Sequence, residues 1–391
     1  MNKILINGAG RGCLNLTKTA KKMGLYVVVT GMDGPCIPLA DKAYREVHPG
    51  HPEEVLEVAK AEYVDAVVTC CNDMGLASVG YCCDQLHLTG LSYEAAKMSS
   101  DKLLMKERLC SKQVRTAKFK KVYNLNDLEQ ALEELQLPVI VKATDLQGSR
   151  GITIVQTKEG LGDAFHEAIS LTHKDYCIVE EFIIGTEFGA QAFVYNGEVL
   201  FVLPHGDETF MSKTAVPIGH YMPYPMNNEL AEDVQVQARN AIKAIGLDNC
   251  AVNIDFIERD NKAYIIELTG RGGANGLTDI VGKYYGIDYY EMMVVMAIGG
   301  DPRKLFDKRL ITPRAAVSKM LTSPKTGIVK SIDVPSLQYT DITMFIESGS
   351  EVRAFTNSND DIGQIVVSGN NLTECAMKID EAVRALTIEL E

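Results

Sequence analysis

Short apolar runs alternate with longer amphipathic segments over the first part of the chain. The runs predict strands at residues 3–7, 26–30 and 66–70, because continuous β-branched and apolar stretches are typical of parallel strands buried on both faces. The segments between them predict helices that end near Lys22 and that span residues 51–61. Strand–helix–strand repeats of this kind predict a doubly wound, Rossmann-like α/β layer over roughly the first 95 residues.

Beyond residue 115 the pattern changes to pairs of strands joined by short polar turns. Asn196-Gly197, between two apolar runs, is the strongest short hairpin signal. Strands are predicted at residues 138–143, 152–155, 177–180, 188–195, 198–203, 252–257 and 263–268, and a helix at 289–297. After Pro302, strands are predicted at 315–321, 343–347 and 364–367, and a closing helix at 372–386. These parts are therefore predicted to be α+β.

Composition narrows the class of protein. The chain has 391 residues, of which 46% are hydrophobic and 23% charged, as in soluble globular proteins of two or three domains. Lys plus Arg number 39 against 52 Asp plus Glu, a formal charge of −13, which disfavours nucleic acid as a partner. No apolar run has the length of a membrane span, and the first residues do not resemble a signal peptide. We expect a cytoplasmic protein.

The ten cysteines include two adjacent pairs, Cys70-Cys71 and Cys82-Cys83. In a chain without a secretory signal, cysteines are expected to be reduced thiols. Four sulfurs could in principle bind a metal, but adjacent residues of an extended segment point to opposite faces. Small buried side chains at a strand end and on a helix are the favoured interpretation.

A first glycine-rich loop, Gly8-x-Gly10-x-Gly12, follows a predicted strand and opens a predicted helix. This context is typical of a dinucleotide site, and it would make the protein an NAD-dependent oxidoreductase. The third glycine of the usual spacing is replaced by Cys13. A tight strand-to-helix turn is therefore an equally open interpretation.

The second glycine-rich loop, Gly148-Ser149-Arg150-Gly151, lies between two predicted strands. It is not a Walker loop, which leads from a strand into a helix, but a glycine hairpin can fold over a polyphosphate and offer its backbone N–H groups. Just before it, Lys142 stands inside an apolar strand. A lysine there needs an anion or a solvent-facing strand face, and the neighbouring loop favours the anion.

Asp255 and Glu267 lie on two strands joined by a polar turn. With a three-residue turn the two carboxylates face each other, with Cβ atoms about 5 Å apart. Like charges in that position need a cation, and Mg²⁺ binds carboxylates together with phosphate oxygens; alternatively, the register slips and one carboxylate faces solvent. Arg271 follows in a glycine-rich segment, where a fixed guanidinium would stabilise transition-state charge.

Taken in order, these residues resemble the ATP-grasp superfamily over nearly the whole chain. The residues that carry the resemblance are Ser100-Asp101-Lys102, the strand ending at Lys142, the loop 148–151, the segments 179–183 and 185–187, Asp255, Glu267 and Arg271. The N-terminal layer is similar to the pre-ATP-grasp domain of biotin carboxylase and carbamoyl-phosphate synthetase, and residues 326–391 are similar to the L-amino-acid ligases. The resemblance implies a Rossmann-like pre-ATP-grasp domain (1–95), an ATP-grasp nucleotide-binding and catalytic domain (96–305) and a small C-terminal α+β domain (306–391).

The resemblance also implies a role for each site residue. Lys102, Lys142 and the loop Gly148, Ser149, Arg150 and Gly151 would hold the phosphates of ATP. Glu180 would contact the adenine amino group, the backbone of Glu181 and Ile183 would line the adenine pocket, and Glu187 would hold the ribose. Asp255 and Glu267 would bind Mg²⁺ or Mn²⁺, and Arg271, with Lys142, would be catalytic. Thr269 replaces the Asn that many members have, so a second metal would be held differently.

The implied activity is an ADP-forming ligase that activates a carboxylate as an acyl phosphate for attack by an amine. Its substrates would be ATP and amino acids or small carboxylates, and the resemblance is compatible with a homodimer. A purine-pathway or carbamoyl-phosphate-type ATP-grasp enzyme, a non-catalytic ATP-binding protein and the NAD enzyme remain alternatives. Lys213 and His220 lie where the family varies by substrate; a contact with a carboxylate is open for each, and a surface loop is favoured.

Overall fold

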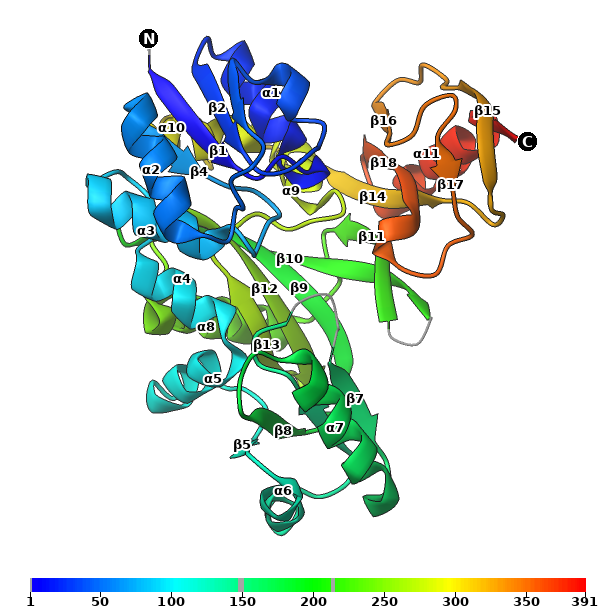
Figure 1. Cartoon of the computed structure of the whole chain (residues 1–391). Coiled ribbons are helices and arrows are strands. Elements are labelled where there is room, and N and C mark those ends of the chain that lie inside the picture. Colours follow the sequence, from blue (N-terminus) through cyan, green and yellow to red (C-terminus); the bar gives the residue numbers. More distant parts are fainter. Residues whose placement is uncertain (1, 147–150, 212–214) are drawn as a thin grey trace.

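The structure is a computed structural model that describes residues 2–146, 151–211 and 215–391. Gly148, Ser149 and Arg150 of the second glycine-rich loop, and Lys213, lie outside the described residues. The described chain is a mixed α/β protein, as predicted. Figure 1 shows the N-terminal layer, a small sheet with helices α6 and α7, and a C-terminal lobe arranged around a long central sheet.

The N-terminal layer is a parallel sheet flanked by helices. Its strands β1 (Lys3–Asn7), β2 (Tyr26–Thr30), β3 (Lys42–Tyr44) and β4 (Ala66–Val68) lie in the order β3-β2-β1-β4. Its helices are α1 (Leu14–Lys22), α2 (Pro52–Glu62) and α3 (Leu76–Leu86). Along β1, Leu5 packs into one apolar core while Ile4 and Ile6 pack into another. This burial on both faces explains the unbroken apolar run and confirms the Rossmann-like prediction.

Two helices, α4 (Tyr93–Ser100) and α5 (Lys102–Ser111), lead into a smaller sheet. That sheet has the order β5-β8-β6-β7, with β5 (Phe119–Val122), β6 (Val139–Lys142), β7 (Ile152–Val155) and β8 (Cys177–Glu181). Helices α6 (Leu125–Ala131) and α7 (Leu161–Leu171) pack on it and share an apolar core with its strands. The opposite face carries Lys142 and Glu180 beside apolar side chains such as Ile178.

The central sheet has eight strands in the order β13-β12-β9-β10-β11-β14-β18-β16. Their bounds are β9 (Thr186–Tyr195), β10 (Glu198–Met211), β11 (Ala215–Met222), β12 (Cys250–Arg259), β13 (Lys262–Thr269), β14 (Ala315–Thr322), β16 (Thr340–Met344) and β18 (Asp361–Gly369). Three helices belong to this part of the fold: α8 (Asn228–Ile245), α9 (Leu277–Tyr285) and α10 (Tyr289–Ala297). Helices α8 and α9 contact the central sheet, and α10 contacts α9. Because β11 pairs with β14, the sheet continues past residue 305 into the C-terminal part.

The C-terminal lobe adds β15 (Gly327–Asp333), β17 (Glu351–Val352) and β19 (Thr387–Leu390) in the order β17-β15-β19, and α11 (Leu372–Ala385). Short 3₁₀ turns occupy Arg11–Cys13, Ile37–Leu39, Lys158–Gly160, Pro302–Lys304 and Ser358–Asp360. Among the described helices, none combines the length and the apolar character that a membrane span requires. The strand predicted at 343–347 begins three residues earlier, because Thr340 already pairs with Val367 of β18.

Candidate active site

One face of the central sheet carries the predicted carboxylate pair. Asp255 on β12 is paired with Glu267 on β13 and with Gly189 on β9. Residues directly opposite each other in antiparallel strands project to the same face. The predicted juxtaposition of Asp255 and Glu267 is therefore confirmed.

The turn that produces this register differs from the predicted one. The strands are joined by a two-residue turn, Asp260-Asn261, with φ of 56° and 58°, as type I′ hairpins require. That turn alone would pair Asp255 with residue 266. A β-bulge beside Asp255 and Phe256 inserts one extra residue and moves the pairing to Glu267.

Two residues along β12 from Asp255, the side chains that lie side by side across β9, β12 and β13 are two amides and a hydroxyl. Asn253 pairs with Gln191 on β9 and with Thr269 on β13. Its Nδ2 donates to Oδ1 of Asp255 at 3.1 Å, while its own Oδ1 accepts from Gln191. The amide oxygen missing at Thr269 is thus present directly across the strand pair, on Asn253. Sequence analysis did not identify Asn253, although its position two residues before Asp255 on one strand is a usable signal.

The electrostatics of the pair are those of a cation site. Burial, the charge of Glu267 and the charge of Asp207 raise the pKa of Asp255 to about 7. Glu267 has a cationic neighbour: Lys102 Nζ lies 3.3 Å from its Oε1 and donates to the carbonyl oxygen of Leu146 at 2.7 Å. A buried carboxylate such as Asp255, which resists ionisation, needs a further positive charge nearby. The all-oxygen donor set of the pair fits Mg²⁺ or Mn²⁺.

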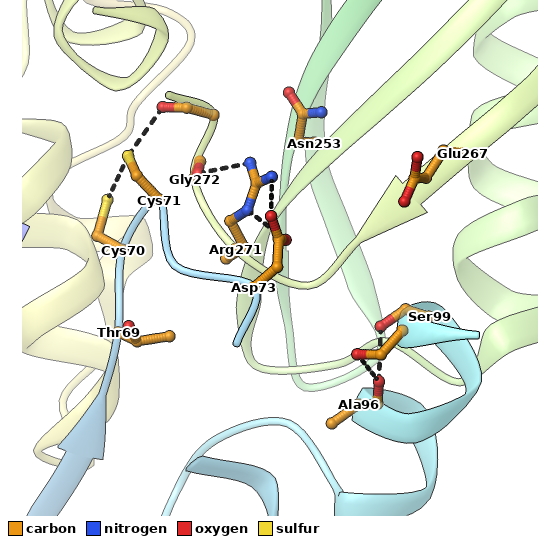
Figure 2. A network of polar contacts seen from close by, with 12 residues as sticks. Thr69, Cys70, Cys71, Asp73, Ala96, Ser99, Asn253, Glu267, Arg271 and Gly272 are labelled. Carbon is orange, nitrogen blue, oxygen red and sulfur yellow. Dashed lines mark hydrogen bonds and ion pairs between the residues drawn. The ribbon is translucent and has the colours of Figure 1, made fainter. Parts of the chain in front are cut away.

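Arg271 is held in a fixed orientation (Figure 2). Its Nε and Nη2 each donate to a different oxygen of Asp73 at 2.7 Å, and Nη1 donates to the carbonyl oxygen of Gly272 at 3.1 Å. Burial alone would lower the pKa of Arg271, but the charge and hydrogen bonds of Asp73 raise it. Asp73 belongs to the N-terminal layer and follows β4. It lies so far from Arg271 in sequence that no local pattern indicates the pair.

Lys142 meets an anion, as predicted, but the anion belongs to the protein. Its Nζ lies 3.0 Å from Oε2 of Glu180, and Lys106 Nζ lies 3.2 Å from the same oxygen. Lys106 also donates to Thr116 Oγ1. The other oxygen of Glu180 is buried and has no hydrogen-bond partner among the described residues. Lys106 was missed, although it lies four residues after Lys102 on α5 and hence on the same helix face.

The other residues that are predicted to bind the nucleotide lie at the end of β8, just after it, and on β9. Ile183 is buried, Glu181 is half-buried and lies 3.8 Å from Arg259, and Glu187 is exposed at the start of β9. Gly151 has φ of 63°, and a Cβ there would lie 3.0 Å from Ala143. Both the backbone conformation and the available space therefore favour glycine at this end of the predicted phosphate loop.

His220 corrects the expectation of a surface loop. It lies on β11, is 4% exposed, and its Nδ1 is 2.6 Å from Oδ1 of Asp207 on β10. The same Asp207 oxygen is 3.0 Å from Nδ1 of His205. The expectation rested on the position of residues 207–221 between the predicted ribose and metal motifs, where the family varies. The described residues of this stretch instead lie on the paired strands β10 and β11.

The first glycine-rich loop packs tightly against its own layer. A Cβ at Gly8 would lie 2.7 Å from Nδ2 of Asn72, and one at Gly12 would lie 2.5 Å from the Cβ of Cys71. These glycines are explained by close packing of a strand-to-helix turn. Both cysteine pairs are free thiols, at the end of β4 and on α3, as predicted.

Comparisons with known proteins agree with this arrangement. A profile of the ATP-grasp domain matches residues 135–279, and a profile of the L-amino acid ligase C-terminal domain 2 matches residues 319–391. Phosphoribosylglycinamide synthetase from Anaerococcus prevotii is 45% identical and superposes with a TM-score of 0.88, covering 100% of both chains. L-amino acid ligase from Bacillus licheniformis has the same fold, with a TM-score of 0.82 at 19% identity. The match covers 100% of this chain and 99% of that one.

Among curated proteins, alanine–anticapsin ligase of Bacillus subtilis strain 168 is 25% identical over 274 residues, or 64% of this chain. The chain spans 57% of the length of that relative. These three relatives are ligases or synthetases by name, in agreement with the predicted enzyme class. The domain profile, the full-length relative at 45% identity and the ordered motifs together place the protein in a family: the chain belongs to the ATP-grasp superfamily.

Proposed function

We propose that this chain is an ADP-forming ligase that activates a carboxylate as an acyl phosphate for attack by an amine. The observation that carries the proposal is the pairing of Asp255 with Glu267 on one sheet face, with Lys102 of α5 lying 3.3 Å from Glu267. Arg271 stands in the loop that continues from β13. Such a site combines the positive charge that a triphosphate needs with carboxylates that hold a divalent cation.

For the nucleotide, Lys102 and Lys142 would contact the phosphates, together with Gly148, Ser149, Arg150 and Gly151. Glu180 suits the adenine amino group, because its buried Oε1 lacks a donor while its other oxygen is held by two lysines. The backbone of Glu181 and Ile183 would complete the adenine pocket. Glu187 is exposed and so accessible to ribose hydroxyls.

Asp255 and Glu267 would hold Mg²⁺, or Mn²⁺ in its place, and Asn253 would supply the amide oxygen that Thr269 lacks. When bound, the ion neutralises phosphate charge in the transition state. The residues fit the ion because their own charges are otherwise poorly compensated: the pKa of Asp255 is raised to about 7 by burial and by neighbouring carboxylates. The chain's own cations, Lys102 and Arg271, complete the compensation.

The chemistry follows from positioning and charge. A carboxylate is a poor electrophile, and transfer of the γ-phosphoryl group to its oxygen provides a leaving group for the amine to displace. Arg271, fixed by Asp73 through two hydrogen bonds, would stabilise the charge that develops on the phosphoryl and acyl oxygens. Little further covalent work by the protein is needed, so most of the rate enhancement would come from orientation and electrostatics.

Glu267→Gln tests the carboxylate site. The amide keeps the shape but removes the charge, so ADP release should fall at least about 100-fold. The remaining activity should need a higher Mg²⁺ concentration, because Asp255 is then the one carboxylate of the pair left to hold the ion. Glu258→Gln on the same hairpin is the matched control, because Glu258 lies at the turn, where it accepts from the backbone nitrogen of Asn261. Full activity of the Glu267 variant would contradict the proposed site.

The substrate class is tested by phosphate release over pairs of amino acids, simple carboxylates and amines with Mg-ATP. Release that requires two specific partners would establish a ligase, and release with bicarbonate alone would indicate carboxylase or carbamoyl-phosphate chemistry. The likeness to the Anaerococcus protein favours a purine-type reaction as the second candidate. Formation of phosphoribosylglycinamide, the product in that protein's name, therefore belongs in the screen.

A further inference from the structure

The β10–β11 hairpin carries a buried cluster of two histidines and an aspartate. Asp207 pairs with His220 across the hairpin, and His205 lies two residues earlier on β10, so all three project to the same sheet face. His205 and His220 are 1% and 4% exposed. One potential ligand atom from each of the three residues lies within 4.8 Å of the others.

The donor atoms converge on one oxygen. Asp207 Oδ1 lies 3.0 Å from Nδ1 of His205 and 2.6 Å from Nδ1 of His220. Both imidazole rings are buried in the sheet, and imidazole nitrogens are the commonest metal ligands among side chains. Asp207 is the most accessible member of the cluster, because its side chain retains 24% exposure. An ion could therefore reach the cluster from the side of Asp207.

His205 has a further nitrogen with no assigned partner. Its Nε2 is buried without a hydrogen bond among the described residues. The Cε1–Nε2 edge lies over Gly189, where a Cβ would come within 2.3 Å of both atoms. Gly189 separates His205 from Asp255 in one row of the sheet. Glycine at this position thus makes room for an imidazole edge directed along the row of Asp255.

We propose that His205, Asp207 and His220 form a binding site for a divalent transition metal ion, separate from the carboxylate pair Asp255–Glu267. Two imidazole nitrogens and one carboxylate oxygen are the ligands that Zn²⁺, Co²⁺ and Mn²⁺ accept, whereas Mg²⁺ prefers oxygen alone. Three protein ligands leave one position open for water or a substrate atom. The proposal does not depend on the ligase activity.

Metal binding predicts a change of tautomer. Without metal, both Nδ1 atoms carry the protons that Asp207 accepts. When Nδ1 of each neutral ring binds the ion, its proton moves to Nε2, so no proton is lost overall. In His205 the new Nε2–H then points along the row of Asp255, and histidine ligands of metals characteristically donate their second N–H to a carboxylate, a carbonyl or water.

The first test is the zinc content of the full chain after dialysis against limiting Zn²⁺. We expect one tightly bound ion in the unaltered protein and its loss in His220→Ala. Asp207→Asn keeps the shape and is the second variant, with thermal unfolding to verify that each variant folds. Asp255→Asn should keep the zinc, and His48→Ala combined with His51→Ala, the other close histidine pair, is the control for surface binding.

The second test is long-range ¹H–¹⁵N NMR of histidine-labelled protein with and without Zn²⁺. We expect the protons of His205 and His220 to move from Nδ1 to Nε2 when Zn²⁺ is added. Three results would each overturn the proposal. The first is that the unaltered protein binds no zinc, and the second is that zinc is lost in Asp255→Asn or in the surface double variant. The third is that the protons stay on Nδ1 when zinc is present. Because neither readout is an activity, failure here is distinguishable from failure of the proposed ligase function.

Discussion

At the scale of single residues, Arg271 depends on the fork geometry of its partner Asp73. A lysine keeps the charge but cannot donate to both oxygens of Asp73 and to Gly272 at once. We predict that Arg271→Lys lowers kcat about 100-fold or more, with little change in KM for ATP. Steady-state ADP release measures both constants. An unchanged kcat would show that charge alone, without fixed orientation, is sufficient.

Asp255 links the site to the pH dependence of stability. Its pKa of about 7 in the fold lies above the ordinary value of 3.8, so between these values the folded chain binds more protons than the unfolded one. In the absence of metal, the contribution of Asp255 to the free energy of unfolding therefore falls as pH rises from about 4 to about 7, by a few kcal/mol, and is then constant.

The prediction is tested with denaturant unfolding in EDTA across that pH range. Asp255→Asn cannot ionise, so the difference between it and the unaltered protein should be small near pH 4 and should grow toward pH 7 in favour of the variant. Adding Mg²⁺ should raise the free energy of unfolding of the unaltered protein above pH 7 and should leave that of the variant unchanged. Parallel curves for the two proteins would mean that Asp255 ionises normally.

At the scale of elements, local patterns predicted what local forces decide. Apolar periodicity predicted β2 and α10 with their exact bounds because burial and propensity act together there. For the β12–β13 hairpin the pairing of Asp255 with Glu267 was predicted for the wrong reason. A bulge compensates for the shorter turn, and bulges respond to packing across several strands, which a single strand sequence does not encode.

The cluster on β10 and β11 shows a different limit. Residues 207–221 are predicted as a surface loop from their position between two motifs, and nothing in the local sequence indicates that His205 and His220 are buried in a sheet. His205 becomes interpretable only when Gly189 on β9 is known to lie beside it. Similarly, a role for Asp73 can be assigned only once its ion pair with Arg271 is known. Residues whose role arises from contacts distant in sequence cannot be found from their own neighbourhood.

At the scale of the whole molecule, three separate regions hold the loop that carries Arg271. Asp73 binds it from the N-terminal layer, Gln191 Oε1 accepts from the backbone nitrogen of Gly273, and Ser318 Oγ donates to the carbonyl oxygen of Asn275. The site is thus complete only when the N-terminal layer, the central sheet and β14 are docked together. Figure 1 shows these regions meeting around α9.

Asp279 on α9 makes this docking testable. It accepts hydrogen bonds from Asn15 on α1, Tyr290 on α10 and Gln364 on β18. Asp279→Ala leaves three donors without their acceptor, and we predict a loss of about 2 kcal/mol in the free energy of unfolding. Amide hydrogen exchange should accelerate in both α1 and β18, which are far apart in sequence.

The matched control is Asp288→Ala, which removes only the N-cap of α10. It should cost about 1 kcal/mol and accelerate exchange within α10 alone. If Asp279→Ala also changed exchange only locally, around α9, the N-terminal layer and the C-terminal lobe would not be coupled through this residue. Coupling of α1 to β18 would instead show that the position of Arg271 depends on contacts spanning the entire chain, because α9 follows directly on the Arg271 loop.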